Sequence, residues 1–173
     1  MSTTAGVARA ARPLVLATGA LALALLAPRL HGPLLVYNAS ASAPIGFYRV
    51  LPAMPLAIGD LVLAQTPDTV RELADRRHYV PATVPLVKRV AAGSGNQVCA
   101  TGGVITIDGA SVAERKSYDG QGRALPSWAG CRVLAADEVF LLMADKPDSF
   151  DSRYFGPVHL DAVIGRLAPL WLR

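Results

Sequence analysis

Short apolar runs separated by turn residues constrain the fold of this chain more than any other feature of its sequence. These runs are rich in β-branched and aliphatic residues, and Gly, Pro, Asn or Asp bound most of them, which is typical of strands joined by turns. Asp108-Gly109, inside the longest run, favours a two-residue hairpin turn. The sequence therefore predicts a fold that is mainly β. The runs occupy residues 59–65, 85–92, 97–113, 138–145 and 162–171.

One or two short helices and a long loop are expected between the strands. Residues 68–79 show hydrophobic spacing typical of a helix, and Asp68 is positioned to cap its N-terminus. Residues 114–130 are polar and rich in Gly, which indicates a long surface loop. No internal repeat is present. Residues 32–173 are expected to form one β-dominated domain.

The N-terminal segment is the most apolar part of the chain. Residues 13–28, between Arg12 and Arg29, are uncharged and mostly Leu and Ala. As a helix they extend about 24 Å, slightly less than the ~30 Å of a hydrocarbon core, and the flanking arginines can snorkel. We expect a short tail at 1–12 and a single transmembrane anchor at 13–31. A cleaved signal peptide and a buried core helix are the alternatives.

The charge of the chain is modest and unevenly distributed. The net charge is +4, and the first 31 residues contain Arg9, Arg12 and Arg29 but no acidic residue. The remainder has 17 − 3 = 14 basic and 13 acidic residues. Basic residues before the apolar segment favour a cytoplasmic N-terminus, so that residues 32–173 would lie in the periplasm. No Lys/Arg block with interleaved aromatics is present, and nucleic-acid binding is not expected.

Several catalytic motifs that depend on histidine or on glycine loops are absent. The chain has no HExxH, no GxSxG and no P-loop sequence. A serine nucleophile would therefore need a base other than histidine, and lysine is the alternative. The three histidines, in unrelated contexts, are His31, His78 and His159.

Lys88 differs from the other two lysines because it lies inside an apolar run, V-P-L-V-K-R-V-A-A. Strand alternation places Lys88 on the same face as Leu86 and Val90. Burial among such neighbours lowers the pKa of a lysine and leaves a neutral amine that can accept a proton. The alternative is a snorkelling lysine whose ammonium group reaches water.

The chain has two cysteines, Cys99 and Cys131. In the periplasm they are expected to form a disulfide bond that tethers the hairpin region to the end of the long loop. In a cytosolic protein they would be inert thiols. Neither a CxxC motif nor clustered histidines accompany them, so no metal site is expected, and no cofactor is expected either.

Three segments, in this order, resemble one family. S-A-S-A-P-I-G-F-Y, L-V-K-R-V-A-A and D-S-F-D-S-R-Y-F-G-P-V are similar to the serine, lysine and Ser-x-Asp-Ser-Arg boxes of type I signal peptidases, the Ser/Lys peptidases of family S26. The chain resembles the conjugative-transfer, TraF-like pilin-maturation branch more closely, through Y-N-x-S-x-S-x-P-x-G and W-x-G-C. The similarity extends from Tyr37 to about Trp171. It implies a signal-peptidase-like β-domain behind the anchor.

The resemblance also implies roles for individual residues. Ser42 matches the nucleophile and Lys88 the general base. The hydroxyl of Ser40 and the backbone N–H of Ser42 match the oxyanion hole. The supporting residues that it implies are Ser149, which would orient the lysine, and the pair Asp151 and Arg153, for which a structural salt bridge is the alternative.

The first box suggests how the nucleophile is held. Pro44 and Gly46 predict a sharp turn that presents Ser42 on exposed backbone. Ala41 and Ala43 are expected to leave room for the approach of a substrate chain.

The predicted function is a serine endopeptidase at the cytoplasmic membrane that cleaves exported or pilin precursor proteins through an acyl-enzyme, in conjugative transfer. Its expected partners are the membrane and the precursor. A general type I signal peptidase would share the catalytic residues, and a self-cleaving repressor-type peptidase would have a DNA-binding helical domain instead of the anchor. A non-catalytic pilus assembly protein is the alternative of a different class. Whether water or an amine resolves the acyl-enzyme is left open.

Overall fold

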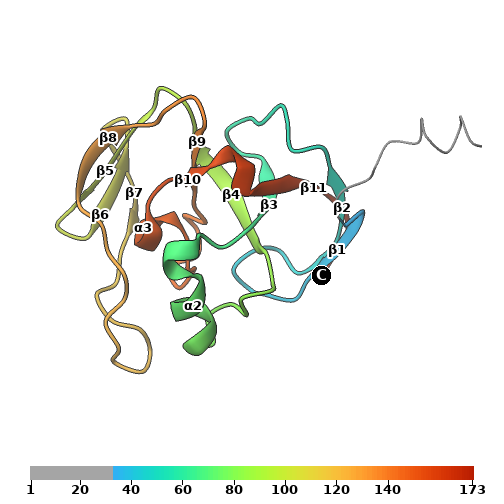
Figure 1. Ribbon diagram of the computed structural model, residues 1–173, viewed down its shortest axis with the longest axis horizontal. Helices are drawn as coiled ribbons and strands as arrows, with labels where there is room; N and C mark the ends of the chain where they lie inside the picture. The colour runs from blue at the N-terminus through green and yellow to red at the C-terminus, as the bar shows by residue number, and fades with distance from the viewer. Residues whose placement is uncertain (1–32) are drawn as a thin grey trace, which may run out of the picture. The chain divides into compact units, whose positions relative to one another are not determined.

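The computed structural model describes residues 33–173, and the anchor expected at 13–31 lies outside the described residues. The described part folds mainly into β-strands with two short α-helices, which confirms the mainly β prediction (Figure 1). None of its helices has both the length and the apolar composition needed to cross a bilayer. The elements are β1 (Leu35–Asn38), β2 (Gly46–Leu51), β3 (Leu61–Ala64), α2 (Asp68–Arg76), β4 (Leu86–Ala92), β5 (Gln97–Thr101), β6 (Val104–Ile107), β7 (Ala110–Glu114), β8 (Gly130–Val133), β9 (Glu138–Leu141), α3 (Ser152–Phe155), β10 (Val158–His159), a 3₁₀ turn (Leu160–Ala162) and β11 (Val163–Leu172).

The strands form two antiparallel sheets. The larger has the order β1-β2-β11-β3-β4-β9-β10, and the smaller has the order β7-β6-β5-β8. A tight turn at 93–96 leads from β4 of the larger sheet into β5 of the smaller one, and the side chain of Asn96 accepts a hydrogen bond from the Gly93 N–H at 3.0 Å. Figure 1 shows the smaller sheet at one end of the domain and β1, β2 and β11 at the other.

Buried side chains connect the sheets and support the serine box. One cluster joins Phe140 and Leu142 to the inner face of β5 and β6, and Trp128 packs edge-on against Phe140 with ring centroids 6.1 Å apart. A second cluster lies beneath the segment that follows Ser42 and ties it to β3, β4 and β11. Its buried members are Ala43, Tyr48, Leu63, Val87, Met143 and Leu167.

The hairpin and the long loop agree with the sequence predictions. Asp108 and Gly109 have positive φ angles of 49° and 81° and connect β6 to β7, as a two-residue turn of the predicted kind requires. The polar segment is a loop between β7 and β8, closed on itself by a bridge between Tyr118 and Ala124.

The predicted helix begins at Asp68 as expected, but the capping role of Asp68 and the C-terminal end of the helix were wrong. Pro67 occupies the N-cap position, and no side chain caps the helix. Asp68 lies in the first turn instead, where its carboxylate forms an ion pair with Arg71 at 2.7 Å. The helix ends at Arg76 rather than at residue 79, because His78 adopts a φ of 58°, which no helical residue has.

Two expectations about the serine box are also corrected. Gly46 is the first residue of β2, and a Cβ there would lie 2.1 Å from the carbonyl oxygen of Trp171, so this glycine permits the close approach of β11. Ala43 is only 2% exposed and packs in the cluster beneath the loop. It therefore fills the core rather than leaving room for a substrate.

Cys99 and Cys131 form the expected disulfide bond. They are directly opposed on neighbouring strands β5 and β8. Because β8 begins where the long loop ends, the bond fastens the end of this loop to the centre of the smaller sheet.

Replacement of both cysteines by serine is expected to lower the free energy of unfolding by about 3 kcal/mol, because the cross-link restricts the unfolded chain. The measurement is urea denaturation of oxidised wild type, reduced wild type and the double variant. Reduced wild type and the double variant should coincide. Equal stability of all three proteins would contradict the prediction.

Candidate active site

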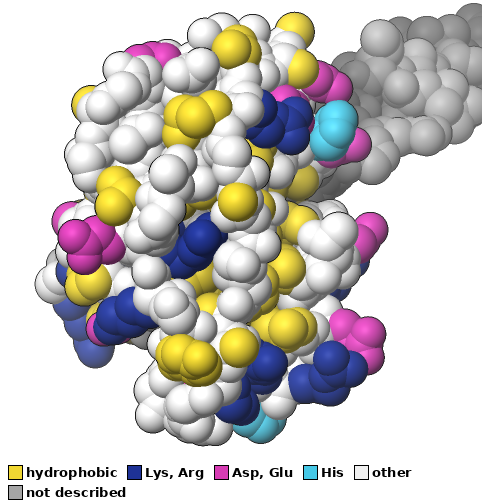
Figure 2. Space-filling model, turned by 90° about the vertical axis from the view of Figure 1, so that its left-hand side faces the viewer, with side chains coloured by type: hydrophobic (Ala, Val, Ile, Leu, Met, Phe, Trp, Pro, Cys, Tyr) yellow, Lys and Arg dark blue, Asp and Glu magenta, His cyan; other side chains and the backbone are white. Residues whose placement is uncertain are grey.

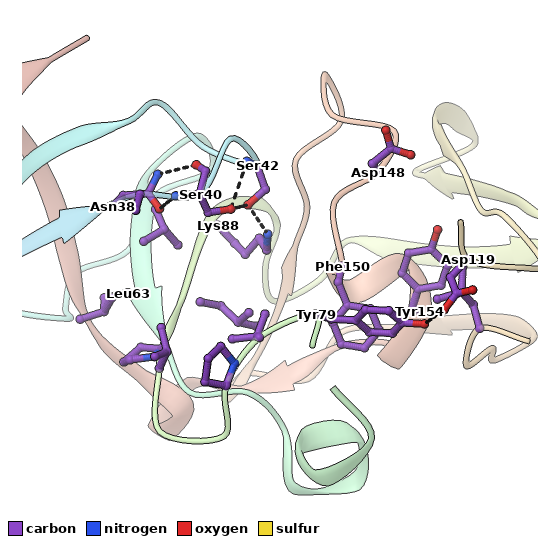
Figure 3. Close-up of a pocket in the computed structure, with 18 of the residues that line it drawn as sticks. Asn38, Ser40, Ser42, Leu63, Tyr79, Lys88, Asp119, Asp148, Phe150 and Tyr154 are labelled. Carbon is purple, nitrogen blue, oxygen red and sulfur yellow. Dashed lines mark hydrogen bonds between the residues drawn. The ribbon is translucent and has the colours of Figure 1, made fainter. Parts of the chain in front are cut away.

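The loop between β1 and β2 presents two serine hydroxyls side by side. The Oγ atoms of Ser40 and Ser42 are 2.9 Å apart, and the Ser42 N–H donates to Ser40 Oγ at 3.3 Å (Figure 3). A turn in which the Ala43 N–H donates to the Ser40 carbonyl, at 3.4 Å, brings them together. Both oxyanion donors that the resemblance implies, the Ser40 hydroxyl and the Ser42 N–H, therefore lie at one point of the loop.

Lys88 reaches this point from β4. Its side chain is 3% exposed, and its Nζ lies 3.2 Å from Ser42 Oγ and 2.8 Å from Ser149 Oγ. The snorkelling alternative is therefore wrong for this lysine. Burial is the main cause that lowers the pKa of Lys88 from its usual 10.5 to about 8.

The supporting pair acts on the turn that carries Ser149. Asp151 and Arg153 form a fully buried ion pair of 2.8 Å. The carboxylate of Asp151 accepts from the Met143 N–H at 3.1 Å, and the guanidinium of Arg153 donates to the carbonyls of Met143 and Lys146 at 2.7 and 3.1 Å. The pair thus fixes the turn at 143–149. The pair is therefore the structural salt bridge of the alternative interpretation. It supports Ser149, which contacts Lys88, and does not contact Ser42 itself.

The opposite charges of this pair also act on the amine. Asp151 raises the pKa of Lys88 and Arg153 lowers it, both less than burial does. Because the two ionic effects oppose each other, burial decides the direction of the shift.

A cleft of about 830 Å³ begins at the serine loop and passes along the start of β4. Figure 3 shows Ser42 and Lys88 on one side and Tyr79, Phe150 and Tyr154 on the other. The long loop completes this far wall and is held there by the hydroxyl of Tyr79, which donates to Asp119 at 2.5 Å. Sequence reasoning missed the aromatic wall, because its residues come together only through tertiary packing.

Among residues 33–173, two strand edges face the cleft without a partner strand. Just before β1, the Leu34 carbonyl accepts a hydrogen bond from the Val50 N–H. Alternation along the strand therefore directs the backbone N–H and C=O of Tyr37 away from β2. In β4, the backbone of Val90 forms its hydrogen bonds on the β3 side, so alternation directs the backbone N–H and C=O of Val87 to the opposite side. Pairing with β9 on that side starts only at Val90, so it does not include Val87. Tyr37 and Val87 both line the cleft.

The surroundings of the cleft show charges of both signs and no metal cluster. Figure 2 shows one face of the domain, on which basic and acidic side chains are interspersed rather than gathered in one patch. Across residues 33–173, no three His, Cys, Asp or Glu side chains are grouped in a way that could hold a metal ion.

This arrangement can support acyl transfer. A neutral Lys88 amine can accept the proton of Ser42 Oγ while its own N–H donates to Ser149 Oγ. The Ser40 hydroxyl and the Ser42 N–H, which bond to each other here, can turn to an oxyanion instead. A buried acceptor for the Ser42 proton and two donors for the oxyanion are the minimum that such a reaction needs.

Comparisons with known proteins identify the family of this chain. The chain is 35% identical over 139 residues to a probable conjugal transfer protein TraF of Sinorhizobium fredii, covering 74% of this chain and 72% of the relative. It is 35% identical over 145 residues to a conjugal transfer protein TraF of Agrobacterium tumefaciens, covering 78% and 80%.

A solved structure, a signal peptidase I of Enterococcus faecalis, matches with a TM-score of 0.39 and 19% identity, over 66% of this chain and 97% of that one. The family described as signal peptidase, peptidase S26, matches residues 7–171. On the strength of this match and of the TraF relatives, the chain belongs to the S26 signal peptidase family, within its conjugal-transfer TraF branch.

Proposed function

We propose that this protein is a serine endopeptidase that cleaves a precursor protein, a pilin or another exported protein, during conjugative transfer. The observation that carries the proposal is the position of Lys88 Nζ, buried between Ser42 Oγ and Ser149 Oγ at 3.2 and 2.8 Å. A lysine buried without a carboxylate partner of its own and with a pKa of about 8 is suited to be a general base.

The reaction begins when Lys88, in its neutral form, takes the proton of Ser42 as Oγ attacks the scissile carbonyl. The Ser40 hydroxyl and the Ser42 N–H stabilise the negative charge on the carbonyl oxygen. Protonated Lys88 then gives its proton to the departing amine, which leaves an ester on Ser42. A second nucleophile, activated by Lys88 in the same way, releases the product and restores the serine.

The unpaired strand edges support an extended substrate. A peptide that enters the cleft as a strand can bond to the backbone of Tyr37 on one side or of Val87 on the other. Main-chain pairing of this kind accepts many sequences and fixes the scissile carbonyl in register with Ser42.

The proposal places the active site beside the cytoplasmic membrane, in the periplasm. Three aromatic residues at the surface of β1, β2 and β11 support it: Tyr37 and Phe47 have ring centroids 4.8 Å apart, and Phe47 and Trp171 6.3 Å. Tyr and Trp are enriched where protein meets the membrane interface. Exposed aliphatic residues on the same strands or next to them are Leu34, Leu35, Leu170 and Leu172.

The test is mass spectrometry of candidate pilin precursors co-expressed with the full chain. Wild type should produce a shortened precursor, and Ser42→Ala should leave it intact. Ser111→Ala, an equivalent change on β7 away from the cleft, should cleave like wild type. Cleavage of secreted preproteins but of no pilin would favour the general signal peptidase. Intact precursors with wild type, together with full transfer by the Ser42→Ala strain, would favour the non-catalytic assembly role.

A further inference from the structure

The end of β1 holds a buried side chain to which the family resemblance gives no role. Asn38 is 6% exposed, although it is polar and stands two residues before Ser40. Within the described part of the chain, its carboxamide has four hydrogen-bond partners, all in the loop between β1 and β2, and because the amide has only two N–H groups, one of them is shared between two carbonyls. The amide nitrogen donates to the carbonyls of Ser40, Ala43 and Pro44 at 3.0, 3.1 and 3.0 Å, and the amide oxygen accepts from the Ser40 N–H at 3.1 Å.

These bonds fix both ends of the loop that carries the nucleophile. Ser40 is held twice, through its N–H and its C=O, while Ala43 and Pro44 are held on the other side of Ser42. Ser42 itself is not bonded to Asn38. Its N–H and its Oγ instead meet the hydroxyl of Ser40. The conformation that aligns the reacting groups therefore depends on one side chain that touches none of them.

A second contact strengthens the far end of the loop. The hydroxyl of Tyr48, which is almost fully buried, donates to the Pro44 carbonyl at 2.6 Å. It holds a single carbonyl, whereas Asn38 holds three and an N–H as well. Asn38 is thus the residue that joins the two ends.

We propose that Asn38 is a positioning residue for catalysis: its carboxamide holds the loop so that the Ser42 N–H and the Ser40 hydroxyl converge on the oxyanion. This inference rests on the proposed function, since it assigns a role within that reaction. It predicts an effect on the catalytic step rather than on substrate binding, because Asn38 lines the cleft with only 6% of its surface exposed and its carboxamide is bonded to the loop that carries Ser42.

The test compares Asn38→Asp with Asn96→Asp in the full chain. An aspartate at 38 keeps an acceptor for the Ser40 N–H but removes both N–H donors and sets a carboxylate against three carbonyls. A displacement of reacting groups by about 1 Å can cost on the order of 100-fold. We expect kcat for a precursor peptide to fall about 10- to 100-fold with KM nearly unchanged, and labelling of Ser42 by a fluorophosphonate to slow by a similar factor.

Asn96 provides the matched control. Its side chain also organises a loop, through the Gly93 N–H and the carboxylate of Asp108, but far along the chain from the serine box. Asn96→Asp should keep the wild-type kcat, even if the variant is less stable than wild type. A milder variant, Asn38→Ser, retains one donor and one acceptor and should have an intermediate kcat even where Asn38→Asp fails to fold.

Amide hydrogen exchange separates the two ways in which the idea can fail. In wild type the Ala43 N–H, which donates to the Ser40 carbonyl and closes the turn, should exchange slowly, and in either Asn38 variant it should exchange at least about tenfold faster. A folded Asn38 variant with wild-type kcat and labelling rate, or one that loses no more activity than Asn96→Asp, overturns the positioning role. A wild-type protein that neither cleaves nor labels, with the exchange difference intact, overturns the proposed function instead.

Discussion

Replacing Lys88 with arginine is expected to lower kcat for precursor cleavage by at least about 10⁴-fold, as is replacing Ser42 with alanine. Arginine keeps the positive charge and is similar to lysine in size, but it stays protonated at any pH at which the protein is folded. It therefore cannot accept the proton of Ser42, whose Oγ lies 3.2 Å from Lys88 Nζ. The measurement is single-turnover cleavage of a precursor peptide by the purified, detergent-solubilised chain.

Graded controls make this result specific. Lys146→Arg, the same change on a lysine outside the cleft, should leave kcat near the wild-type value. Ser40→Ala removes one oxyanion donor but no proton acceptor, and should lower kcat by about 10²- to 10³-fold, less than Ser42→Ala. Substantial cleavage by folded Lys88→Arg would show that another group is the base.

The strands that carry Lys88 and Cys99 could be predicted because their residues show the pattern locally. β4 and β5 are apolar runs bounded by turn residues, and the Asp108-Gly109 turn is encoded in two adjacent residues. β1 and β8 escaped prediction for the opposite reason. β1 is a four-residue strand that begins shortly after the apolar segment, and β8 is a four-residue, exposed strand whose pairing is set by β5.

The meeting of the catalytic residues could not be derived from patterns in the chain. Ser42 and Lys88 are 46 residues apart, and Lys88 and Ser149 are 61 apart. Resemblance to a family supplied these pairings, whereas periodicity showed only that Lys88 lies on an apolar face. The role of Ala43 was misjudged for the same reason, because its neighbours Leu63 and Met143 come from distant parts of the chain.

Asn38 is an intermediate case. Asn next to a Ser-rich segment commonly bonds to the backbone of the following residues, so a local signal existed. This local pattern predicts bonds to the nearest backbone groups, such as the Ser40 N–H. The bond to Pro44 depends instead on how the whole loop closes. Loop closure in turn depends on Tyr48 and on the packing of Ala43.

The rate of cleavage is expected to rise with pH through the pKa of Lys88 and to level off above about 8. Only the neutral amine accepts the Ser42 proton, so activity follows its fraction, which is about a tenth at pH 7. A solvated lysine would be about 0.04% neutral at pH 7, and the rate would then rise only near pH 10.4. The measurement is the pH dependence of kcat/KM for a peptide without titrating side chains, with Lys146→Arg as a control that should show the same limb.

The free energy of unfolding should also depend on the protonation of Lys88, and it should also rise with pH. In the unfolded chain a lysine titrates near 10.4, and in the folded protein Lys88 titrates near 8. Between these values the unfolded state binds more protons, so the free energy of unfolding gains from Lys88 as pH rises from about 8 to 10.4. Below pH 8 both states are protonated, and the folded state bears the full cost of the buried charge, on the order of 3 kcal/mol.

Lys88→Met removes this dependence because methionine has a similar length and no charge. The difference in the free energy of unfolding between the variant and wild type should therefore favour the variant most below pH 8 and shrink steadily towards pH 10.4. Urea denaturation at intervals across this range measures it. A cleavage rate that rises near pH 8, together with a stability difference that shrinks towards pH 10.4, would assign both pH dependences to Lys88. A limb near 10.4, or a stability difference that does not change with pH, would show that the amine is solvated and that its proximity to Ser42 does not make it the base.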